Sequence, residues 1–168
     1  DNPGFNHTYA DRNDKNTIVT RGAELAVQKG MIVTNSPGNS GNESWHDIIA
    51  PADGDSVLTV GAVNSSGQIA SFSSYGPSYD GRIKPNVASV GWGTVIAGAT
   101  GNPASGSGTS FSNPNLAGLV TCLWQAFPDF SNMEILDAVQ KSSSQYASPD
   151  DRVGFGIPNM RVAYDLLA

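Results

Sequence analysis

Gly108-Thr109-Ser110-Phe111-Ser112-Asn113-Pro114 is the stretch from which the fold of this chain is predicted. It follows a Gly/Ser-rich loop, residues 98–106. It precedes apolar residues that recur at three- and four-residue steps as far as Phe127, a spacing typical of a buried helix. Pro114 fits the first turn of such a helix, where a backbone N–H has no partner to lose. We therefore expect Ser110 where a loop becomes a helix.

A hydroxyl at this junction has two interpretations. Ser110 is either a helix N-cap, the usual reason for a serine at such a boundary, or a nucleophile. As a nucleophile it would lie at the positive end of the helix dipole, with its own backbone N–H as a free donor. That arrangement suits chemistry in which attack creates a negatively charged oxygen. The stretch alone favours the N-cap, so the choice depends on the rest of the chain.

Length and charge narrow the class of protein. The 168 residues suffice for one domain but not comfortably for two. A net charge of -6, with nine Lys plus Arg and no basic cluster, argues against nucleic acid or an anionic membrane as partner. No apolar run approaches the roughly 20 residues that span a bilayer. Cys122, the single cysteine, falls within the apolar helix, where we expect it to be a small buried hydrophobe.

Alternating helical and apolar segments predict an α/β fold, with a mainly parallel sheet flanked by helices. A helix is expected from Asn16 or Thr17 to Lys29, and Gly30 is a natural stop. A short apolar strand follows at once, which is the pattern of an α/β unit. The predicted strands are 31–34, 57–63, 84–88 and 94–97, and the later helices are 132–142 and 158–167.

A second polar loop, Ser36-Pro37-Gly38-Asn39-Ser40-Gly41, directly follows the predicted strand 31–34. Active sites of α/β proteins collect at this edge of the sheet. The glycines let a backbone come close, and the Asn39 amide is then free to donate to a substrate. An Asx-turn at Asn39 explains this stretch equally well.

Together these segments resemble the subtilisin-like serine proteases. The resemblance covers residues 17–168, and the matching segments follow one another in the family's order. Its most specific motif is Gly108-Thr109-Ser110 ahead of Pro114, and Gly38-Asn39-Ser40-Gly41 after a strand resembles the family's oxyanion loop. The other segments that carry it are 56–63, 71–77, 84–88 and 154–159.

The resemblance implies a role for each site residue. Ser110 would be the nucleophile, and the Asn39 side chain with the Ser110 backbone N–H would form the oxyanion hole. The substrate residue before the scissile bond would be bound by Ser36, Pro37, Gly38 and Thr109. The resemblance also implies a peptide or protein substrate, and a secreted or cell-envelope location.

The family's proton-transferring residues are not recognisable. Its chain order is Asp, His and then Ser, and neither of the first two motifs occurs before Asn39. We therefore expect residues 1–168, which begin at Asp1 without a Met, to be the C-terminal part of a single protease domain. The Asp- and His-bearing half would be its partner, and an apolar face should be exposed where that half packs. Without a base, the isolated chain should be inactive.

Two further interpretations stay open. His46, beside Asp47, could be a base only within about 3 Å of Ser110, and neighbouring side chains in a strand point to opposite faces. We expect His7 to be a solvated surface residue. The alternative to an enzyme is a non-catalytic, protease-like module that binds a peptide or a protein.

No cofactor is predicted from the residues themselves. Calcium, which relatives of the family bind, could be held by Asp53-Gly54-Asp55 or by Asp150-Asp151. Carboxylates in loops are more often solvated turn residues, and neither stretch has the spacing of an EF-hand.

Overall fold

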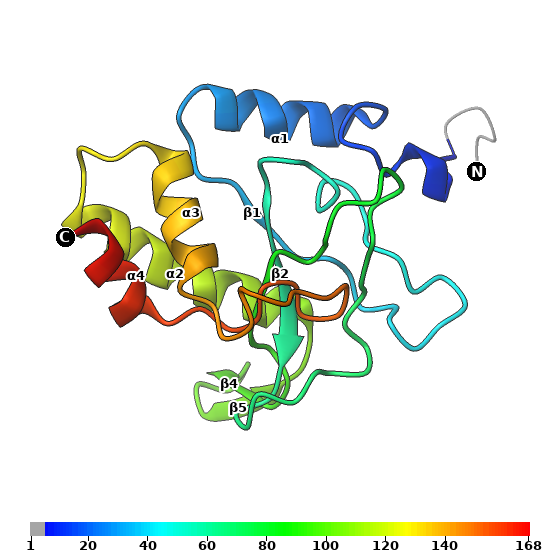
Figure 1. The fold of residues 1–168 in the computed structure, drawn as a ribbon. Coiled ribbons are helices and arrows are strands. Elements are labelled where there is room, and N and C mark those ends of the chain that lie inside the picture. The colour runs from blue at the N-terminus through cyan, green and yellow to red at the C-terminus, as the bar shows by residue number, and fades with distance from the viewer. Residues whose placement is uncertain (1–5) are drawn as a thin grey trace.

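The computed structural model of the chain describes residues 6–168 and has the predicted α/β architecture (Figure 1). After a short 3-10 helix, η2 (Tyr9–Asp11), the elements follow one another as a helix, five strands and three further helices in the described part of the chain. They are α1 (Ile18–Gln28), β1 (Thr34–Asn35), β2 (Leu58–Val63), β3 (Val87–Val90), β4 (Thr94–Ala97), β5 (Pro103–Gly106), α2 (Thr109–Ala126), α3 (Asn132–Lys141) and α4 (Met160–Leu167). Residues 1–5 lie outside the described residues.

The central sheet is parallel, as predicted, with the order β1-β2-β3. Every residue of β2 is buried, as expected for a strand covered on both faces. β4 and β5 form a separate antiparallel hairpin at the opposite end of the molecule from α1 (Figure 1). Since parallel strands end at the same edge of a sheet, the segments that follow β1 and β3 lie on either side of the end of β2.

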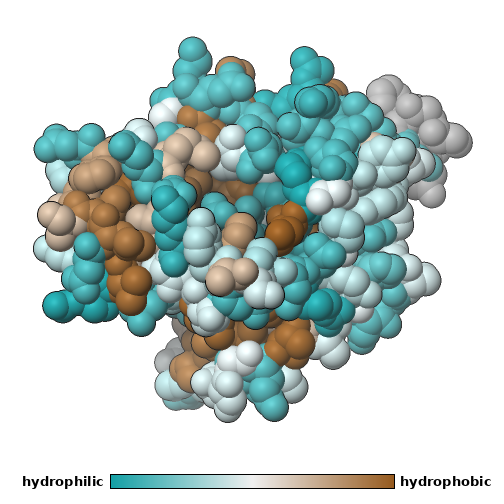
Figure 2. All heavy atoms as spheres, in the orientation of Figure 1, coloured by the Kyte–Doolittle hydropathy of each residue, from teal (hydrophilic) through white to brown (hydrophobic). Residues whose placement is uncertain are grey.

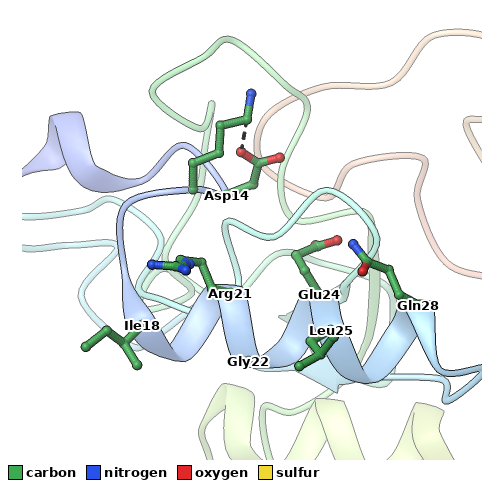
Figure 3. Close-up of a pocket in the computed structure, with 8 residues that line it drawn as sticks. Asp14, Ile18, Arg21, Gly22, Glu24, Leu25 and Gln28 are labelled. Atoms are coloured by element: carbon green, nitrogen blue, oxygen red, sulfur yellow. Dashed lines mark ion pairs between the residues drawn. The ribbon is translucent and has the colours of Figure 1, made fainter.

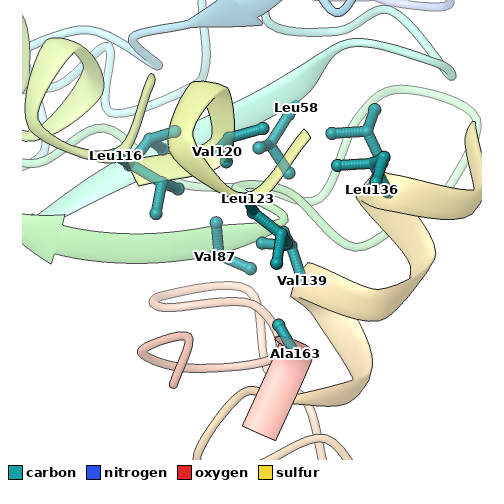
Figure 4. Packing of buried hydrophobic residues seen from close by; sticks show 10 residues of the cluster. Leu58, Val87, Leu116, Val120, Leu123, Leu136, Val139 and Ala163 are labelled. Carbon is teal, nitrogen blue, oxygen red and sulfur yellow. The ribbon is translucent and has the colours of Figure 1, made fainter. Parts of the chain in front are cut away.

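The core lies between this sheet and the C-terminal helices (Figure 4). Leu116, Val120 and Leu123 of α2 face Leu58 and Val87 of the sheet. Val60 of β2 belongs to the same cluster, and α3 and α4 add the remaining side chains. α3 begins with a capping box, in which Ser131 and Glu134 exchange hydrogen bonds at the first turn. The sheet therefore fixes the position of α2, whose first turn carries Ser110.

Two predicted strands have different bounds in the structure. β1 covers only Thr34–Asn35, because the Met31 carbonyl accepts a hydrogen bond from the Asn132 side chain instead of joining the ladder. β3 begins at Val87 rather than at residue 84, and the Lys84 carbonyl accepts from Gly76 N–H. β5 lies in the stretch 98–106 that we predicted as loop, so that prediction was wrong.

Some apolar side chains are exposed in this chain. Cys122 is exposed rather than buried, because no other element of the described chain covers that face of α2.

Hydrophobic atoms gather on the left of Figure 2, where α3 and α4 lie in Figure 1. A groove of about 720 Å³ runs beside α1, and Ile18 and Leu25 point to the same side of that helix (Figure 3). None of the helices in residues 6–168 is both long enough and apolar enough to cross a bilayer.

Lys84 is a fully buried amine. Its Nζ donates to the carbonyls of Gly54 and Val57, at 2.6 and 2.8 Å, and to Asn86 Oδ1 at 2.9 Å. Burial, assisted by the nearby charge of Arg82, lowers the pKa of Lys84 to about 7. The side chain therefore connects the loop before β2 to the segment that leads into β3. Burial destabilises the charged form of the amine, which is why the pKa is lowered.

We expect the stability of the protein to rise between pH 7 and pH 10 because of Lys84. The pKa of this lysine is about 7 when folded and 10.5 in its ordinary state, so within this window the unfolded chain binds more protons. The free energy of unfolding then increases with pH. Urea denaturation at pH 7, 8, 9 and 10 measures this rise, and Lys84→Met should flatten it. Lys29→Met, at an exposed lysine, is the control and should keep the wild-type rise. If the free energy of unfolding rises equally with pH in Lys84→Met and in wild type, the rise does not come from Lys84.

Candidate active site

Ser110 lies in the first turn of α2, one residue further into the helix than the predicted boundary. Gly108 is the N-cap and Thr109 the first helical residue, so Ser110 is not an N-cap. Its backbone N–H is one of the four at a helix start that have no intrahelical partner. In residues 6–168, neither this N–H nor the hydroxyl has a hydrogen-bond partner, and the residue is exposed. Ser110 therefore offers both a free hydroxyl and a free donor.

Pro114 is not in the first turn, as we had predicted, but inside α2. A proline at this point cannot donate to the carbonyl four residues earlier, which is that of Ser110. The helix tolerates this loss because Ser110 is exposed and its carbonyl can reach water.

The Asn39 side chain contacts the residue next to Ser110. Asn39 Oδ1 accepts two hydrogen bonds from Thr109, one from the backbone N–H and one from Oγ1, both 2.9 Å long. The oxygen is occupied in this way, whereas Nδ2 has no hydrogen-bond partner among residues 6–168 and is available as a donor. A Cβ placed on Gly108 would lie 3.6 Å from this Nδ2, so the amide nitrogen lies over the start of α2. Two loops 71 positions apart (110 minus 39) thus meet at one place.

The segment before Asn39 is held rigidly. Ser36 Oγ donates to the Thr109 carbonyl at 2.9 Å, and the Pro37 carbonyl accepts from Ile49 N–H. Gly38 has a φ of +117°, and a side chain there would meet Ser74 Oγ at 2.9 Å, so only glycine fits. The predicted wall of the substrate pocket therefore lies beside Ser110. Its part in binding a substrate stays a prediction.

The Thr109 side chain is buried beside the loop that carries Asn39. Its single O–H lies within hydrogen-bonding distance of both Gly38 O, at 3.2 Å, and Asn39 Oδ1, at 2.9 Å. This contact and the bond from the Thr109 N–H orient the Asn39 amide. Substrate binding by Thr109 stays a prediction.

Sequence reasoning missed two supporting hydroxyls. Ser112 is fully buried and donates to the carbonyls of Val60 and Thr109, at 3.2 and 3.0 Å, which ties the first turn of α2 to β2. Ser74 Oγ accepts from Ser40 N–H at 3.1 Å and so supports the loop after Asn39. Ser112 could have been found, because it lies four residues before buried Leu116 on the same helix face.

Neither histidine serves Ser110 in the described chain. The His46 ring stacks on Tyr75, with centroids 4.6 Å apart, and its Nε2 lies 3.6 Å from Asp47 Oδ1. This approach differs from the predicted opposite orientation, because the segment forms only an isolated bridge at Asp47 and no strand. His7 lies 3.9 Å from Asp11 in the N-terminal segment. Within residues 6–168 no hydrogen bond joins either imidazole to Ser110.

In each of the two acidic stretches that could hold calcium, one aspartate accepts hydrogen bonds from the protein. Asp53 is fully buried, and its two oxygens accept from Thr20 Oγ1 at 2.7 Å and from Asp14 N–H at 3.2 Å. Asp150 Oδ1 accepts the N–H groups of Arg152 and Val153, which lowers the pKa of its carboxyl. The described residues contain no group of three or more His, Cys, Asp or Glu arranged for a metal. Asp53 and Asp150 therefore serve as hydrogen-bond acceptors within their turns.

The chemistry open to this arrangement is acyl transfer. Ser110 supplies a hydroxyl and a backbone N–H in the first turn of α2, and Asn39 Nδ2 lies over the preceding Gly108. Two preorganised donors of this kind stabilise the oxyanion of a tetrahedral intermediate.

Comparisons with known proteins identify the family of this chain. The family model described as "Subtilase family" matches residues 5–156. Subtilisin amylosacchariticus from Bacillus subtilis subsp. amylosacchariticus is 31% identical over 148 residues, which are 88% of this chain and 37% of that protein. The thermostable alkaline protease from Halalkalibacterium halodurans is 32% identical over 131 residues, covering 75% and 34% of the two chains.

Solved structures show the same fold. The prenylagaramide maturation protease PagA has a TM-score of 0.74 at 22% identity, with 88% of this chain and 55% of that chain covered. MycP1 from Mycobacterium smegmatis has a TM-score of 0.71 at 23% identity, with coverage of 89% and 46%. The chain thus spans about a third to a half of the curated relatives that it matches, and about half of the solved structures.

Proposed function

The chain belongs to the subtilase family, and we propose that it supplies the nucleophile and the oxyanion hole of a serine endopeptidase. The observation that carries this proposal is the contact between Thr109 and Asn39 Oδ1. It turns the Asn39 amide nitrogen toward the start of α2, where Ser110 has a free N–H and a free hydroxyl. A serine that served only as a helix cap would need no second donor from a distant loop.

The proposed reaction has two stages. In the first, Ser110 Oγ forms a bond to the carbon of the scissile peptide, and its proton passes to a base. The oxygen of that carbon becomes negatively charged between Ser110 N–H and Asn39 Nδ2. The peptide C–N bond then breaks, the amine leaves with the proton, and an acyl-enzyme remains. In the second stage, water hydrolyses the acyl-enzyme with the same base and the same donors.

The base is proposed to come from another part of the polypeptide. In the family it is a histidine oriented by an aspartate, and both motifs precede the oxyanion asparagine. Here His46 is engaged by Tyr75 and Asp47. The substrate would be a peptide or a protein. A secreted or cell-envelope location is part of the same proposal, and it follows from the likeness to subtilisins.

The second candidate function is a non-catalytic module that binds a peptide or a protein through the same loops. The absence of an imidazole beside Ser110 in residues 6–168 favours it for the isolated chain. The sequence of the parent polypeptide distinguishes the two candidate functions. An active protease requires His and Asp motifs of the family elsewhere in it, whereas a binding module does not.

We expect the isolated 168-residue chain to react very slowly with a fluorophosphonate probe. Without a neighbouring base the Ser110 hydroxyl is protonated and weakly nucleophilic. In the parent polypeptide the same probe should label Ser110 rapidly, and tryptic mass spectrometry locates the label. Rapid labelling of the isolated chain would show that a base lies within these residues. No labelling of a folded parent would favour the binding module.

A further inference from the structure

The strand β5 leads directly into the candidate active site. Its last residue, Gly106, is separated from Ser110 by Ser107, Gly108 and Thr109. The turn after β3 is joined to the same stretch: Gly108 N–H donates to the Gly91 carbonyl at 2.7 Å, and Gly93 N–H donates to Ser107 Oγ at 3.0 Å. The β4–β5 hairpin and the turn 91–93 are therefore fixed to the backbone that carries Ser110.

The inner face of the hairpin is attached to α2. A Cβ placed on Gly106 would lie 2.9 Å from both Ile96 Cδ1 and Phe111 Cζ, so these side chains close that face. The outer face carries Val95, paired across the ribbon with Ser105, and Ala97, paired with Pro103. Val95 is 78% exposed, and Trp92, in the adjoining turn, is 45% exposed. Two apolar side chains thus lie unburied beside the site.

The stretch of chain that carries this hairpin and the start of α2 has no charged side chain. Residues 85–128 contain no Asp, Glu, Lys, Arg or His, although the chain as a whole has a net charge of -6. An exposed surface without charges loses little solvation energy when an uncharged peptide covers it. Burial of its apolar side chains then favours binding.

The topology gives the direction of a bound substrate. In the sheet order β1-β2-β3, the segment Ser36–Gly38 follows β1 and the turn 91–93 follows β3, so they lie on opposite sides of the start of α2. If the residue before the scissile bond lies on the first segment, the residues after the bond extend toward the second. An extended peptide advances about 3.3 Å per residue, so two or three residues reach the hairpin.

We propose that Trp92 and Val95 form a surface for the part of the substrate that follows the scissile bond, and that this surface selects uncharged, apolar residues. This inference rests on the proposed endopeptidase function. The occupant is the substrate itself, because the surface is continuous with the backbone of Gly108 and Ser110 and has no charge to attract an ionic partner.

The experiment uses the full polypeptide that contains residues 1–168, with Val95→Glu and Val95→Lys as a charge pair. The substrates are quenched fluorescent peptides that share one acyl side and carry Leu, Lys or Glu at the second and third positions after the scissile bond. A peptidyl methyl ester with the same acyl side provides a substrate that has no residues beyond the bond. Val162→Glu and Val162→Lys on α4, where Val162 is 42% exposed, are the matched control pair.

In wild type we expect kcat/KM to be about five- to tenfold higher for the Leu peptide than for either charged peptide. The ratio of kcat/KM for the Lys and Glu peptides should differ about tenfold between Val95→Glu and Val95→Lys at low salt, with Glu at position 95 favouring the Lys peptide. The Val162 pair should leave this ratio unchanged. If ester and peptides are cleaved but the Val95 pair behaves like the Val162 pair, the inference is wrong. If neither ester nor peptide is cleaved, the proposed function fails and the inference with it.

Discussion

Replacing Ser110 by Ala in the full polypeptide is expected to reduce kcat for peptide hydrolysis by about 10⁶-fold. This is the loss of kcat measured when the serine of the triad is removed from a subtilisin, a relative of this chain. Ser110→Ala removes the hydroxyl that forms the acyl-enzyme and leaves its backbone N–H in place. The variant should fold normally, because the hydroxyl has no partner in residues 6–168 and the residue is exposed.

Progress curves with a fluorogenic peptide, together with labelling by a fluorophosphonate, measure this loss. The matched control is Ser44→Ala, an exposed serine in the loop that follows Asn39, which should retain full activity. Activity that survives in Ser110→Ala, with its label moved to another residue, would show that the nucleophile is elsewhere. An equal loss in Ser44→Ala would point to damage of the loop rather than of the chemistry.

The elements with a strong local pattern could be predicted from the sequence. α1 begins at the Thr17 cap and ends before Gly30, and β2 is a continuous apolar run, so pattern and packing agree. β5 could not be predicted, because Pro103–Gly106 has neither β-branched residues nor alternation. It is held in a hairpin by pairing with β4 and by the contact of Gly106 with Phe111, which are tertiary features.

In the candidate site too, the features with a sequence motif could be predicted, and those that depend on tertiary contacts could not. Motifs and family order brought together Asn39 and Ser110, and the two loops do lie in contact through Thr109. The bonds that orient the amide depend on the three-dimensional meeting of two loops, so the role of the Thr109 hydroxyl could not be read from spacing. Lys84 shows the limit most clearly. A lysine is expected at the surface, yet here carbonyls of a distant loop bind its amine inside the protein.

Asn39 gives the second large expected effect. In the full polypeptide, Asn39→Leu should lower kcat by about 10²- to 10³-fold and change KM little. This is the loss measured when one oxyanion donor is removed from a subtilisin, so the figure comes from a relative. The interaction with Nδ2 forms only as the carbonyl oxygen becomes charged, and a donor used only in the transition state affects kcat rather than substrate binding.

Asn39→Asp distinguishes two roles of Asn39: the hydrogen bond that Nδ2 would donate to the oxyanion, and the hydrogen bonds from Thr109 that hold the loop in place. A carboxylate keeps an oxygen for the two hydrogen bonds from Thr109, so the loop should hold its place. It replaces the Nδ2 donor by a second, negatively charged oxygen that repels the developing oxyanion, and kcat should fall at least as far as in Asn39→Leu. Asn42→Leu, at an exposed position in the same loop, is the matched control. Full activity in Asn39→Asp would mean that Asn39 only supports the loop, and the oxyanion would then need another donor beside Ser110 N–H.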